Sequence, residues 1–303
     1  MYRTLVILRH TFLESIVQPI FLLLLALGAA MLIVFGLLPF FTLGEDTVMF
    51  KAVALDMVLL IALIVTLFAT SKSIYEEIED RTMLTLMSKP VGRWEVLVGK
   101  YLGIVAAALL AVVVLGAVAE LCILYRIPTD YMLRSWTMDD REIRQITDYR
   151  LMHLAGFLPS LLLAWLELCV LAAIGVALST RFSLVVNLPA VIIIYIAGNL
   201  TRFLPSSSPD QSPAVNLISK TVKLVLPYLA TFDLRSKTIY HVIALKDTQF
   251  WPRPGTVQQD VVYPGQIWAY VGIAALYGIA YSTFALSAGM WLFKTRELGG
   301  AEG

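Results

Sequence analysis

Six long apolar stretches alternate with polar segments along this chain of 303 residues. A bilayer core about 30 Å thick is crossed by about 20 mostly apolar residues in a helix, which satisfies its own backbone hydrogen bonds in lipid. A transmembrane β-barrel would instead show short strands of alternating polarity. The pattern therefore predicts an all-α integral membrane protein with six transmembrane helices. They are expected at residues 20–41, 52–70, 101–125, 154–180, 184–200 and 267–293.

The polar segments between these stretches predict further elements. Residues 1–17 place Leu5, Leu8, Phe12 and Ile16 at helical spacing, which is typical of an amphipathic helix lying in the membrane interface. The alternative is a direct helical extension of the first span. Residues 126–150 are densely charged and are expected to form a solvated cap. Residues 201–266 have turn-rich ends around a stretch of helical apolar spacing, so this loop is expected to hold short helices.

An even number of spans places both chain ends on one side of the membrane. Basic residues favour the cytoplasmic side for these ends only slightly. Most basic residues on the opposite side lie in two longer loops, where the charge rule is weaker. We therefore expect the chain in the cytoplasmic membrane of the cell, with both termini in the cytoplasm. Residues 201–266 then form an extracytoplasmic loop.

Composition supports a membrane protein and narrows the classes of partner. Hydrophobic residues make up 59% and charged residues 15% of the chain, which is more apolar and less charged than a soluble domain. The net charge of +1 gives no reason to expect a nucleic-acid partner. Both cysteines, Cys122 and Cys169, fall in apolar stretches, so we expect neither a disulfide framework nor a metal cluster. Because residues 1–19 lack a small-residue cleavage site, we expect no cleaved signal peptide and a single transmembrane domain over residues 1–303.

Ionisable residues inside the apolar stretches are candidates for function, because a charge in lipid is costly and usually faces a cavity or a partner. Glu167 lies near the middle of its stretch and either lines a path or dimer contact, or is a protonated packing residue. Asp56 and Glu120 lie nearer the ends and are expected to reach headgroup water. Asn187 stands near Pro189, which either widens a cavity by a kink or only bends the helix. Glu167 and Asn187 are the candidates for a translocation path.

The polar segment at residues 72–100 is held tightly between the second and third spans. Its acids precede several apolar positions, and Lys89, Pro90 and Gly92 then interrupt the pattern. Acidic residues suit the positive end of a helix dipole, so the acids are expected at the N-terminus of a short helix lying crosswise at the membrane face. Such a helix could pass force to a soluble partner. The acids are Glu76, Glu77, Glu79 and Asp80, and the apolar positions are Ile78, Met83, Leu84, Leu86 and Met87.

This segment resembles the signature of the type-2 ABC exporter permeases, and the order of spans and loops resembles the layout of that family over nearly the whole chain. Many family members carry Gly where Arg81 stands, so the chain resembles one subgroup of the family. We name residues 77–100 the signature segment. The residues that carry the resemblance are Glu77, Glu79, Arg81, Thr82, Leu86, Met87, Ser88, Lys89, Pro90, Val91, Arg93, Glu95, Gly99 and Lys100.

The resemblance implies a dimer of permeases, either two copies or two homologues, seated on two ABC-type ATP-binding subunits. It also implies that residues 72–100 form a coupling helix docked in a groove of the ATPase, which the N-terminal helix touches as well. By position, one group of residues would contact the ATPase and another would shape the return of the chain to the membrane. The first group is Glu77, Glu79, Asp80, Arg81 and Thr82, and the second is Lys89, Pro90 and Arg93.

The chain shows no nucleotide-binding motif of its own. Residues 92–101 place six residues between two glycines and a Tyr after the Lys, whereas a P-loop needs four residues there and a Ser or Thr after the Lys. No H-E-x-x-H motif or Cys/His cluster suggests a metal site either. We therefore expect no cofactor on this chain, no catalytic activity of its own, and ATP bound by a partner subunit.

The sequence thus predicts the membrane-spanning permease subunit of an ATP-driven exporter, in contact with membrane lipid. A second hypothesis is a secondary transporter coupled to an ion gradient through Asp56, Glu120 and Glu167. A third is a membrane scaffold that transports nothing. Only the first requires an ATPase partner.

Overall fold

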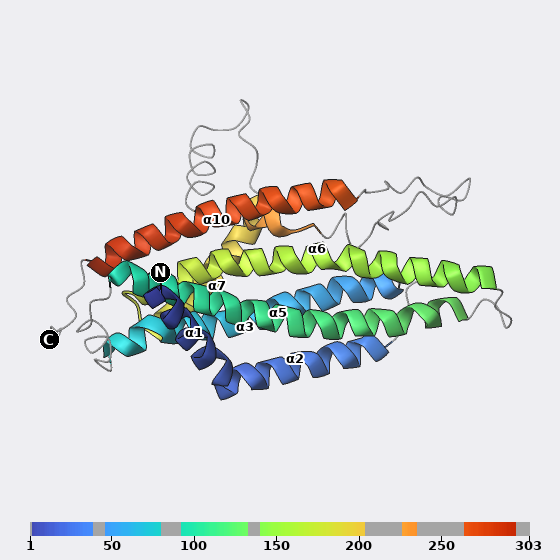
Figure 1. Ribbon diagram of the computed structural model, residues 1–303, viewed down its shortest axis with the longest axis horizontal. Helices are drawn as coiled ribbons and strands as arrows, with labels where there is room; N and C mark the ends of the chain where they lie inside the picture. The colour runs from blue at the N-terminus through green and yellow to red at the C-terminus, as the bar shows by residue number, and fades with distance from the viewer. Residues whose placement is uncertain are drawn as a thin grey trace, which may run out of the picture.

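The structure is a computed structural model. Long helices packed side by side make up the described part of the chain (Figure 1). The structure describes residues 2–38, 46–79, 92–132, 140–203, 226–234 and 264–294. Every regular element within these ranges is helical, so the predicted all-α class is confirmed. The elements are α1 (Tyr2–Val17), α2 (Pro19–Leu37), α3 (Asp46–Glu79), α5 (Arg93–Met132), α6 (Asp140–Ser179), α7 (Leu184–Leu200), η1 (Thr201–Phe203), η2 (Leu229–Phe232) and α10 (Pro264–Lys294).

Within the described ranges, five helices carry an apolar stretch long enough to cross a membrane. These stretches are Pro19–Leu37, Met49–Ser71, Arg93–Arg126, His153–Ser179 and Gly265–Lys294. The sixth predicted span is α7, which has the predicted bounds but only 17 residues. At 1.5 Å per residue it is about 25 Å long, shorter than a bilayer core of about 30 Å. The structure therefore bears out five full-length spans and leaves α7 as a short apolar helix.

Three helices extend well past their apolar stretches. Helix α3 has 34 residues, and α5 and α6 have 40 each. At 1.5 Å per residue they reach about 50–60 Å, so their polar ends project beyond a membrane core. Much of the predicted charged cap at residues 126–150 is accordingly helical, because α5 continues to Met132 and α6 begins at Asp140.

The end of α3 corrects one prediction about the signature segment. The acids Glu76, Glu77 and Glu79 lie in the last turns of α3, whereas the sequence placed them at the N-terminus of a new helix. The reason is local, because residues 46–79 contain no Gly or Pro that would end the helix earlier. The predicted crosswise helix falls mainly on residues 80–91, which lie outside the described residues.

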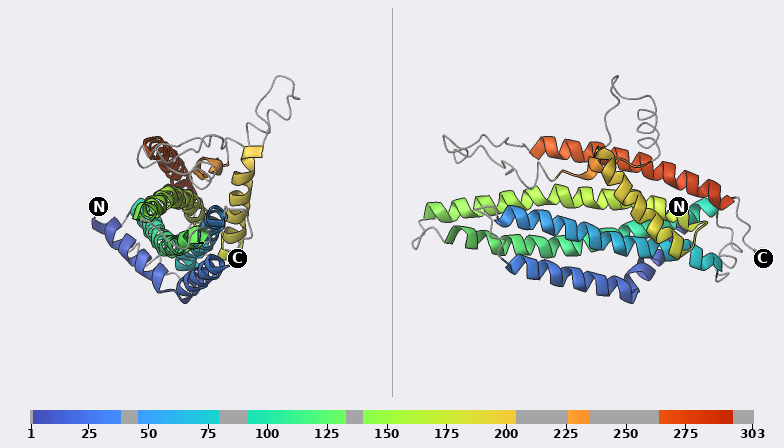
Figure 2. Two further views of the ribbon diagram at one scale, coloured as in Figure 1. Left: turned by 90° about the vertical axis from the view of Figure 1, so that its right-hand side faces the viewer. Right: turned by 180° about the vertical axis from the view of Figure 1, so that it is seen from behind.

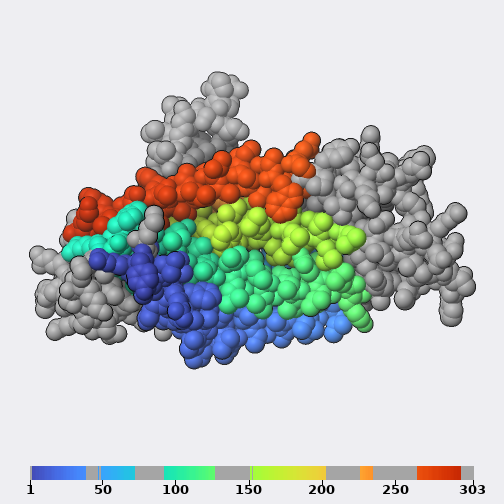
Figure 3. Space-filling view, in the orientation of Figure 1, coloured from blue at the N-terminus to red at the C-terminus, as the bar shows by residue number. Residues whose placement is uncertain are grey.

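Helix α6 occupies the centre of the bundle. Its apolar stretch is 78% buried, against 22% for the stretch in α2 at the periphery. Helices α3 and α5 pack against it, α10 lies along another side, and α7 crosses obliquely over α3 and α6 (Figure 2). In the space-filling view α1 and α2 form one edge of the visible face and α10 the other (Figure 3). A side chain in the middle of α6 is therefore enclosed by neighbouring helices.

Helix α1 is a separate element, so its reading as a direct extension of the first span is wrong. Gln18 between α1 and α2 has an extended backbone with ψ of 130°, and Pro19 then starts α2, where its missing N–H is tolerated. Of the predicted apolar face, Leu8, Phe12 and Ile16 are partly buried, whereas Leu5 is 62% exposed. Apolar residues therefore cover two sides of α1, one against the bundle and one facing out.

Two glycines one helical turn apart let α1 lie directly on α5. A Cβ atom built at Gly103 would lie 2.7 Å from the Thr11 Cβ atom and 2.8 Å from the Leu8 carbonyl oxygen. A Cβ atom at Gly99 would lie 2.8 Å from the Ile7 side chain. Small residues spaced four apart permit such close approach between helices in membranes. The Gly99–Gly103 pair therefore fixes where α1 sits on α5.

Arg126 fastens the other end of α5 to α2. Its Nη1 atom donates to the carbonyl oxygens of Phe35, Gly36 and Leu38, at 3.2, 3.1 and 2.9 Å, and its guanidinium lies 5.5 Å from the centre of the Phe50 ring. Carbonyls at a helix C-terminus lack partners within the helix, and a cation suits that end of the dipole. Only 6% of Arg126 is exposed, so it does not form part of a solvated cap as the sequence suggested.

We expect Gly103→Ala to destabilise the protein, because the added methyl group would press against the backbone of α1. Overpacking of this kind costs about 1–3 kcal/mol. The matched control is Gly272→Ala, since a Cβ atom at Gly272 meets nothing within 4 Å and Ala favours a helix over Gly. Thermal unfolding in detergent should show a lower midpoint for the first variant only. Equal midpoints would contradict the close contact between α1 and α5.

Candidate functional site

One end of the bundle gathers the start and end of the signature segment, and we name it the signature end. Here α3 ends at Glu79 and α5 begins at Arg93, while α10 ends at Lys294 close by (Figure 1). Helix α1 packs on the first turns of α5 at the same end. The signature end therefore brings together the end of α3, the starts of α1 and α5, and the end of α10.

The first turn of α5 is closed by its own side chain. The Gly92 backbone N–H donates to Glu95 Oε2 at 3.0 Å, while Val96 N–H donates to the Gly92 carbonyl at 3.2 Å. A Glu at the third helical position that accepts from the N-terminal cap residue is half of a capping box. Its negative charge also suits the positive end of the helix dipole. Gly92 and Glu95 of the signature segment thus define where α5 starts.

Arg93 joins this start of α5 to the last turn of α10. Its Nη1 atom donates to the carbonyl oxygens of Phe293 at 2.9 Å and of Lys294 at 3.3 Å. Its guanidinium also lies 5.3 Å from the centre of the Phe293 ring, and Phe293 is almost fully buried. Both contacts favour a cation at this position. The structure therefore gives Arg93 partners inside the chain.

The other predicted contacts to an ATPase are only partly placed. Glu77 and Glu79 lie in the last turns of α3 at the signature end. The remaining candidates, Asp80, Arg81, Thr82, Lys89 and Pro90, lie outside the described residues. The described half of the signature segment, residues 92–100, ties α5 to α1 and α10.

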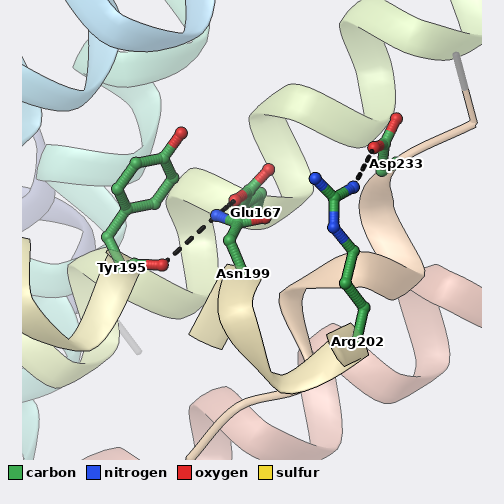
Figure 4. A network of polar contacts seen from close by, with 5 residues as sticks. All are labelled: Glu167, Tyr195, Asn199, Arg202 and Asp233. Carbon is green, nitrogen blue, oxygen red and sulfur yellow. Dashed lines mark hydrogen bonds and ion pairs between the residues drawn. The ribbon is translucent and has the colours of Figure 1, made fainter. Parts of the chain in front are cut away.

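A polar cluster lies at a second place, in the middle of α6 (Figure 4). Glu167 is only 6% exposed, and its Oε1 atom accepts a hydrogen bond from Asn199 Nδ2 at 3.4 Å. The same Nδ2 donates to the Tyr195 carbonyl at 3.2 Å, which holds the amide in place. Glu167 stands 12 residues before Ser179 and 14 after His153, the limits of the apolar stretch. Its carboxyl group is therefore at the middle of the most buried span.

An ion pair lies beside this cluster. Arg202 of η1 donates from Nη1 to Asp233 Oδ2 at 3.2 Å, which joins the end of α7 to the segment at residues 226–234 (Figure 4). The side chains of both residues are partly exposed, so the pair contributes little to stability by itself. Both residues line the same cavity as Asn199.

Two neighbouring cavities open onto these side chains within the described part of the chain. The inner one, about 30 Å³, is lined by Leu55, Leu59, Ser160, Ala164, Glu167, Tyr195, Asn199, Phe232 and Asp233. The outer one, about 300 Å³, is lined by Asp56, Tyr195, Ile196, Asn199, Leu200, Arg202 and Asp233. Because Tyr195, Asn199 and Asp233 line both, the two cavities adjoin. We name them together the polar cavity.

Backbone that is not α-helical forms one wall of the polar cavity. The segment at residues 226–234 carries η2, whose Leu229 packs on Gly198 and whose Phe232 is buried. Two tyrosines of α10 supply the hydrogen bonds that a helix would provide. Tyr277 Oη accepts from the Tyr228 N–H at 2.8 Å, and Tyr270 Oη donates to the Thr231 carbonyl at 2.7 Å. Such backbone is tolerated at membrane depth only where protein buries it or where it lines a cavity.

The structure does not bring Asn187 to Glu167. Asn187 is fully buried near the start of α7, where its Nδ2 donates to the Gly175 carbonyl at 3.1 Å. It stands 12 residues from Asn199, which is about 18 Å along the helix. Asn187 therefore joins α7 to α6 at the signature end, and it does not line the polar cavity.

The intramembrane acids also separate. Asp56 lines the outer cavity, whereas the sequence suggested headgroup water. Glu120 is on α5, which contributes no described residue to either cavity. Sequence reasoning missed Tyr195, Asn199, Arg202 and Asp233. The order of the two apolar stretches could have pointed to Asn199. Helices α6 and α7 form a hairpin with a turn at residues 180–183, so residues at similar sequence separations from the turn come together, as Glu167 and Asn199 do.

Comparison with known proteins decides the family. The family model described as ABC-2 family transporter protein matches residues 5–298. The chain belongs to the ABC-2 transporter family. No curated protein matches it at a significant level.

Membership of the ABC-2 family covers both places described above, because the matched residues reach from α1 into the chain after α10. The family that the sequence resembles is thereby confirmed. The protein is a multi-pass membrane subunit of an ABC transporter, and such subunits generally work with an ABC ATP-binding partner. In this ABC-2 protein the signature end is the part that projects beyond the apolar stretch of α3, and the polar cavity is buried in the bundle.

We expect Arg93→Gln to lower the free energy of unfolding by about 1.5–3 kcal/mol, the contribution typical of hydrogen bonds to a charged group. Arg93→Lys should recover part of this, because Lys keeps the charge and loses the planar fork. Arg181→Gln is the control, since Arg181 is an exposed arginine beyond the C-terminus of α6. Chemical unfolding in detergent measures all three. A loss in Arg181→Gln equal to that in Arg93→Gln would contradict the link between α5 and α10.

A double-mutant cycle tests the contact between Glu167 and Asn199. We expect Glu167→Gln and Asn199→Leu to be coupled by about 0.5–1.5 kcal/mol in the free energy of unfolding, because each removes part of the same hydrogen bond. The control cycle pairs Glu120→Gln with Asn199→Leu and should be additive within about 0.5 kcal/mol. Additivity in both cycles would show that the contact contributes nothing.

Proposed function

We propose that this chain is the permease subunit of an ATP-driven exporter in the cell membrane, with both termini in the cytoplasm. In this proposal the signature end docks on an ABC-type ATP-binding subunit. A second copy of the chain, or a homologous permease, completes the transporter. ATP is bound and hydrolysed in the partner, and this chain carries the movement of an unidentified cargo.

The observation that carries the proposal is the projection of α3. Its apolar stretch ends at Ser71, but the helix continues for eight more residues to Glu79. At 1.5 Å per residue, this places Glu79 about 12 Å beyond the apolar stretch. The end of α3 at residues 77–79 is then held away from the lipid, where a soluble subunit can dock.

The ties at the signature end support a mechanical role for this segment. Displacement of residues 80–91 would act on α5 directly at its start. Arg93 would pass that displacement to α10 through the carbonyls of Phe293 and Lys294, and the close contact at Gly99 would pass it to α1. Helix α10 in turn touches α6 at Gly289, where a Cβ atom would lie 2.7 Å from the Ala177 Cα atom. An ATPase that moves one segment would therefore move three helix ends as a unit.

The outer side of α1 supports its proposed place in the membrane interface. Leu5, Val6 and Leu13 are 43–62% exposed on the side away from α5. Arg3, His10 and Glu14 form the polar strip beside them. A helix with apolar residues on one exposed side and charges next to them suits the boundary between acyl chains and headgroups.

The secondary transporter remains a second candidate for one specific reason. Asp56 and Glu167 lie at the outer and inner parts of the same polar cavity. However, Glu120 is not near them, so the three-carboxylate relay is not formed among the described residues. A secondary transporter would also need no ATPase, whereas the ABC-2 family implies one.

Co-expression with the ABC-type ATPase encoded beside this chain tests the exporter proposal. We expect the ATPase to stay bound during purification, and charge reversal by Glu77→Lys or Glu79→Lys to reduce the bound fraction at least about 10-fold, because close charged pairs at an interface couple strongly. Glu142→Lys is the matched control, because Glu142 lies at the start of α6, at the opposite end of the bundle (Figure 1). An ATPase that never binds, or binds all variants equally, would sink the docking proposal and favour the gradient-driven transporter.

A further inference from the structure

The polar cavity lies at the depth of the middle of a membrane span. A protein that only crosses the membrane needs no polar cavity there. Glu167 opens into it from the middle of the apolar stretch of α6. Ionisable groups at this depth are costly and mark ligand or ion pathways by default. Helix α7 also stops here, at Leu200, and the segment at residues 226–234, which is not α-helical, completes the wall. Irregular backbone at a substrate site in the midplane is a recurring arrangement in membrane transporters.

The outer cavity has walls of two kinds. Asp56, Arg202 and Asp233 form a charged wall. Ile196 and Leu200 of α7 form an apolar wall, and each is half exposed on the outside of the bundle, at 50% and 54%. A molecule seated here therefore meets charges on its inner side and an apolar, outward-facing surface on the other. This arrangement fits an amphiphile whose polar head points inward.

The charge of the residues that line the polar cavity decides which polar head of an amphiphile is favoured. Among the described residues that line the polar cavity, Asp56, Glu167 and Asp233 are acidic and Arg202 is the basic one. Arg202 is already held by Asp233 at 3.2 Å. In their ionised forms these groups carry a net negative charge, which attracts a cation and repels an anion, and the attraction is stronger at low dielectric than in water.

Hydrogen-bonding capacity narrows the head further. A primary ammonium group has three N–H donors, whereas a quaternary ammonium group has none. Around the inner cavity stand three groups that accept hydrogen bonds from N–H donors, namely the carboxylates of Glu167 and Asp233 and the Ser160 hydroxyl.

We propose that the polar cavity binds the primary ammonium head of an amphiphile, with its apolar part along Ile196 and Leu200 of α7. The ammonium group lies in the inner cavity next to Glu167, and Asp56 attracts it at the outer opening. The binding itself follows from the cavity alone, but its role as cargo recognition rests on the proposed exporter function.

The test measures binding of radiolabelled dodecylammonium to the full-length protein in phosphatidylcholine nanodiscs, counted as the part displaced by excess unlabelled probe. Dodecanol and laurate, with neutral and anionic heads, should displace it at least about 10-fold more weakly, which corresponds to the loss of one hydrogen bond to a charged group. Glu167→Gln should weaken the binding of dodecylammonium by about 10-fold or more, since Gln keeps the shape and removes the charge.

Two further variants keep the test decisive. Glu120→Gln makes the same chemical change in α5, outside the polar cavity, and should leave binding unchanged. Asp56→Asn changes an exposed side chain, so it should fold even if Glu167→Gln does not, and it should weaken binding by several-fold. Equal displacement by dodecanol overturns the proposal, and so does a loss in Glu120→Gln equal to that in Asp56→Asn.

The outcomes separate this inference from the exporter proposal. If the ATPase binds at the signature end but dodecylammonium shows no preference over dodecanol, only the cavity proposal fails. If dodecylammonium binds as expected but no ATPase stays with the chain, the cavity stands and the exporter function fails.

Discussion

No backbone N–H or carbonyl group can stay unpaired inside the lipid without a large cost, and this constraint shapes the interior of the protein. The five long helices meet it by themselves over their apolar stretches. Helix α7 does not reach across, and the chain beyond it continues as η1. In the neighbouring segment at residues 226–234, Tyr277 and Tyr270 of α10 bond the Tyr228 N–H and the Thr231 carbonyl. The polar cavity lies where α-helical structure is interrupted and side chains from another helix bond the backbone instead.

The same constraint acts at the ends of the helices, where the last carbonyls have no partner in their own helix. Helix α5 solves it twice with an arginine, since Arg126 caps α2 at one end and Arg93 caps α10 at the other. Each guanidinium also lies over a phenylalanine ring, Phe50 or Phe293. Because α5 is continuous between the two arginines, it fixes the positions of two peripheral helices relative to the core. Movement at one end of α5 therefore has a rigid route through the bundle.

The signature segment combines two physical tasks. Residues 92–100 hold α5 in place through the Glu95 cap, the Arg93 contacts and the glycine contact at Gly99. Residues 77–79 end a projecting helix, and in the proposed function they belong to the segment that docks on the partner. A partner that pulls on the projecting part would act on a start of α5 that is already fastened to α1 and α10. The polar cavity lies elsewhere, near the middle of α6, so docking and ligand recognition would occupy separate parts of the molecule.

The sequence by itself determined the class of protein and the family, because long apolar runs and the signature segment are local patterns. It also placed α7 correctly at residues 184–200, since the apolar run is a local pattern. It misplaced the acids at Glu76–Glu79, because no local signal shows how far a helix without Gly or Pro continues past the membrane. Only the tertiary structure decided that Glu167 meets Asn199 and that Asn187 does not join them, because this depends on how α6 and α7 align across their turn. Likewise, the partners of Arg93 lie about 200 residues away in the chain, so only packing of α10 on the bundle could reveal them.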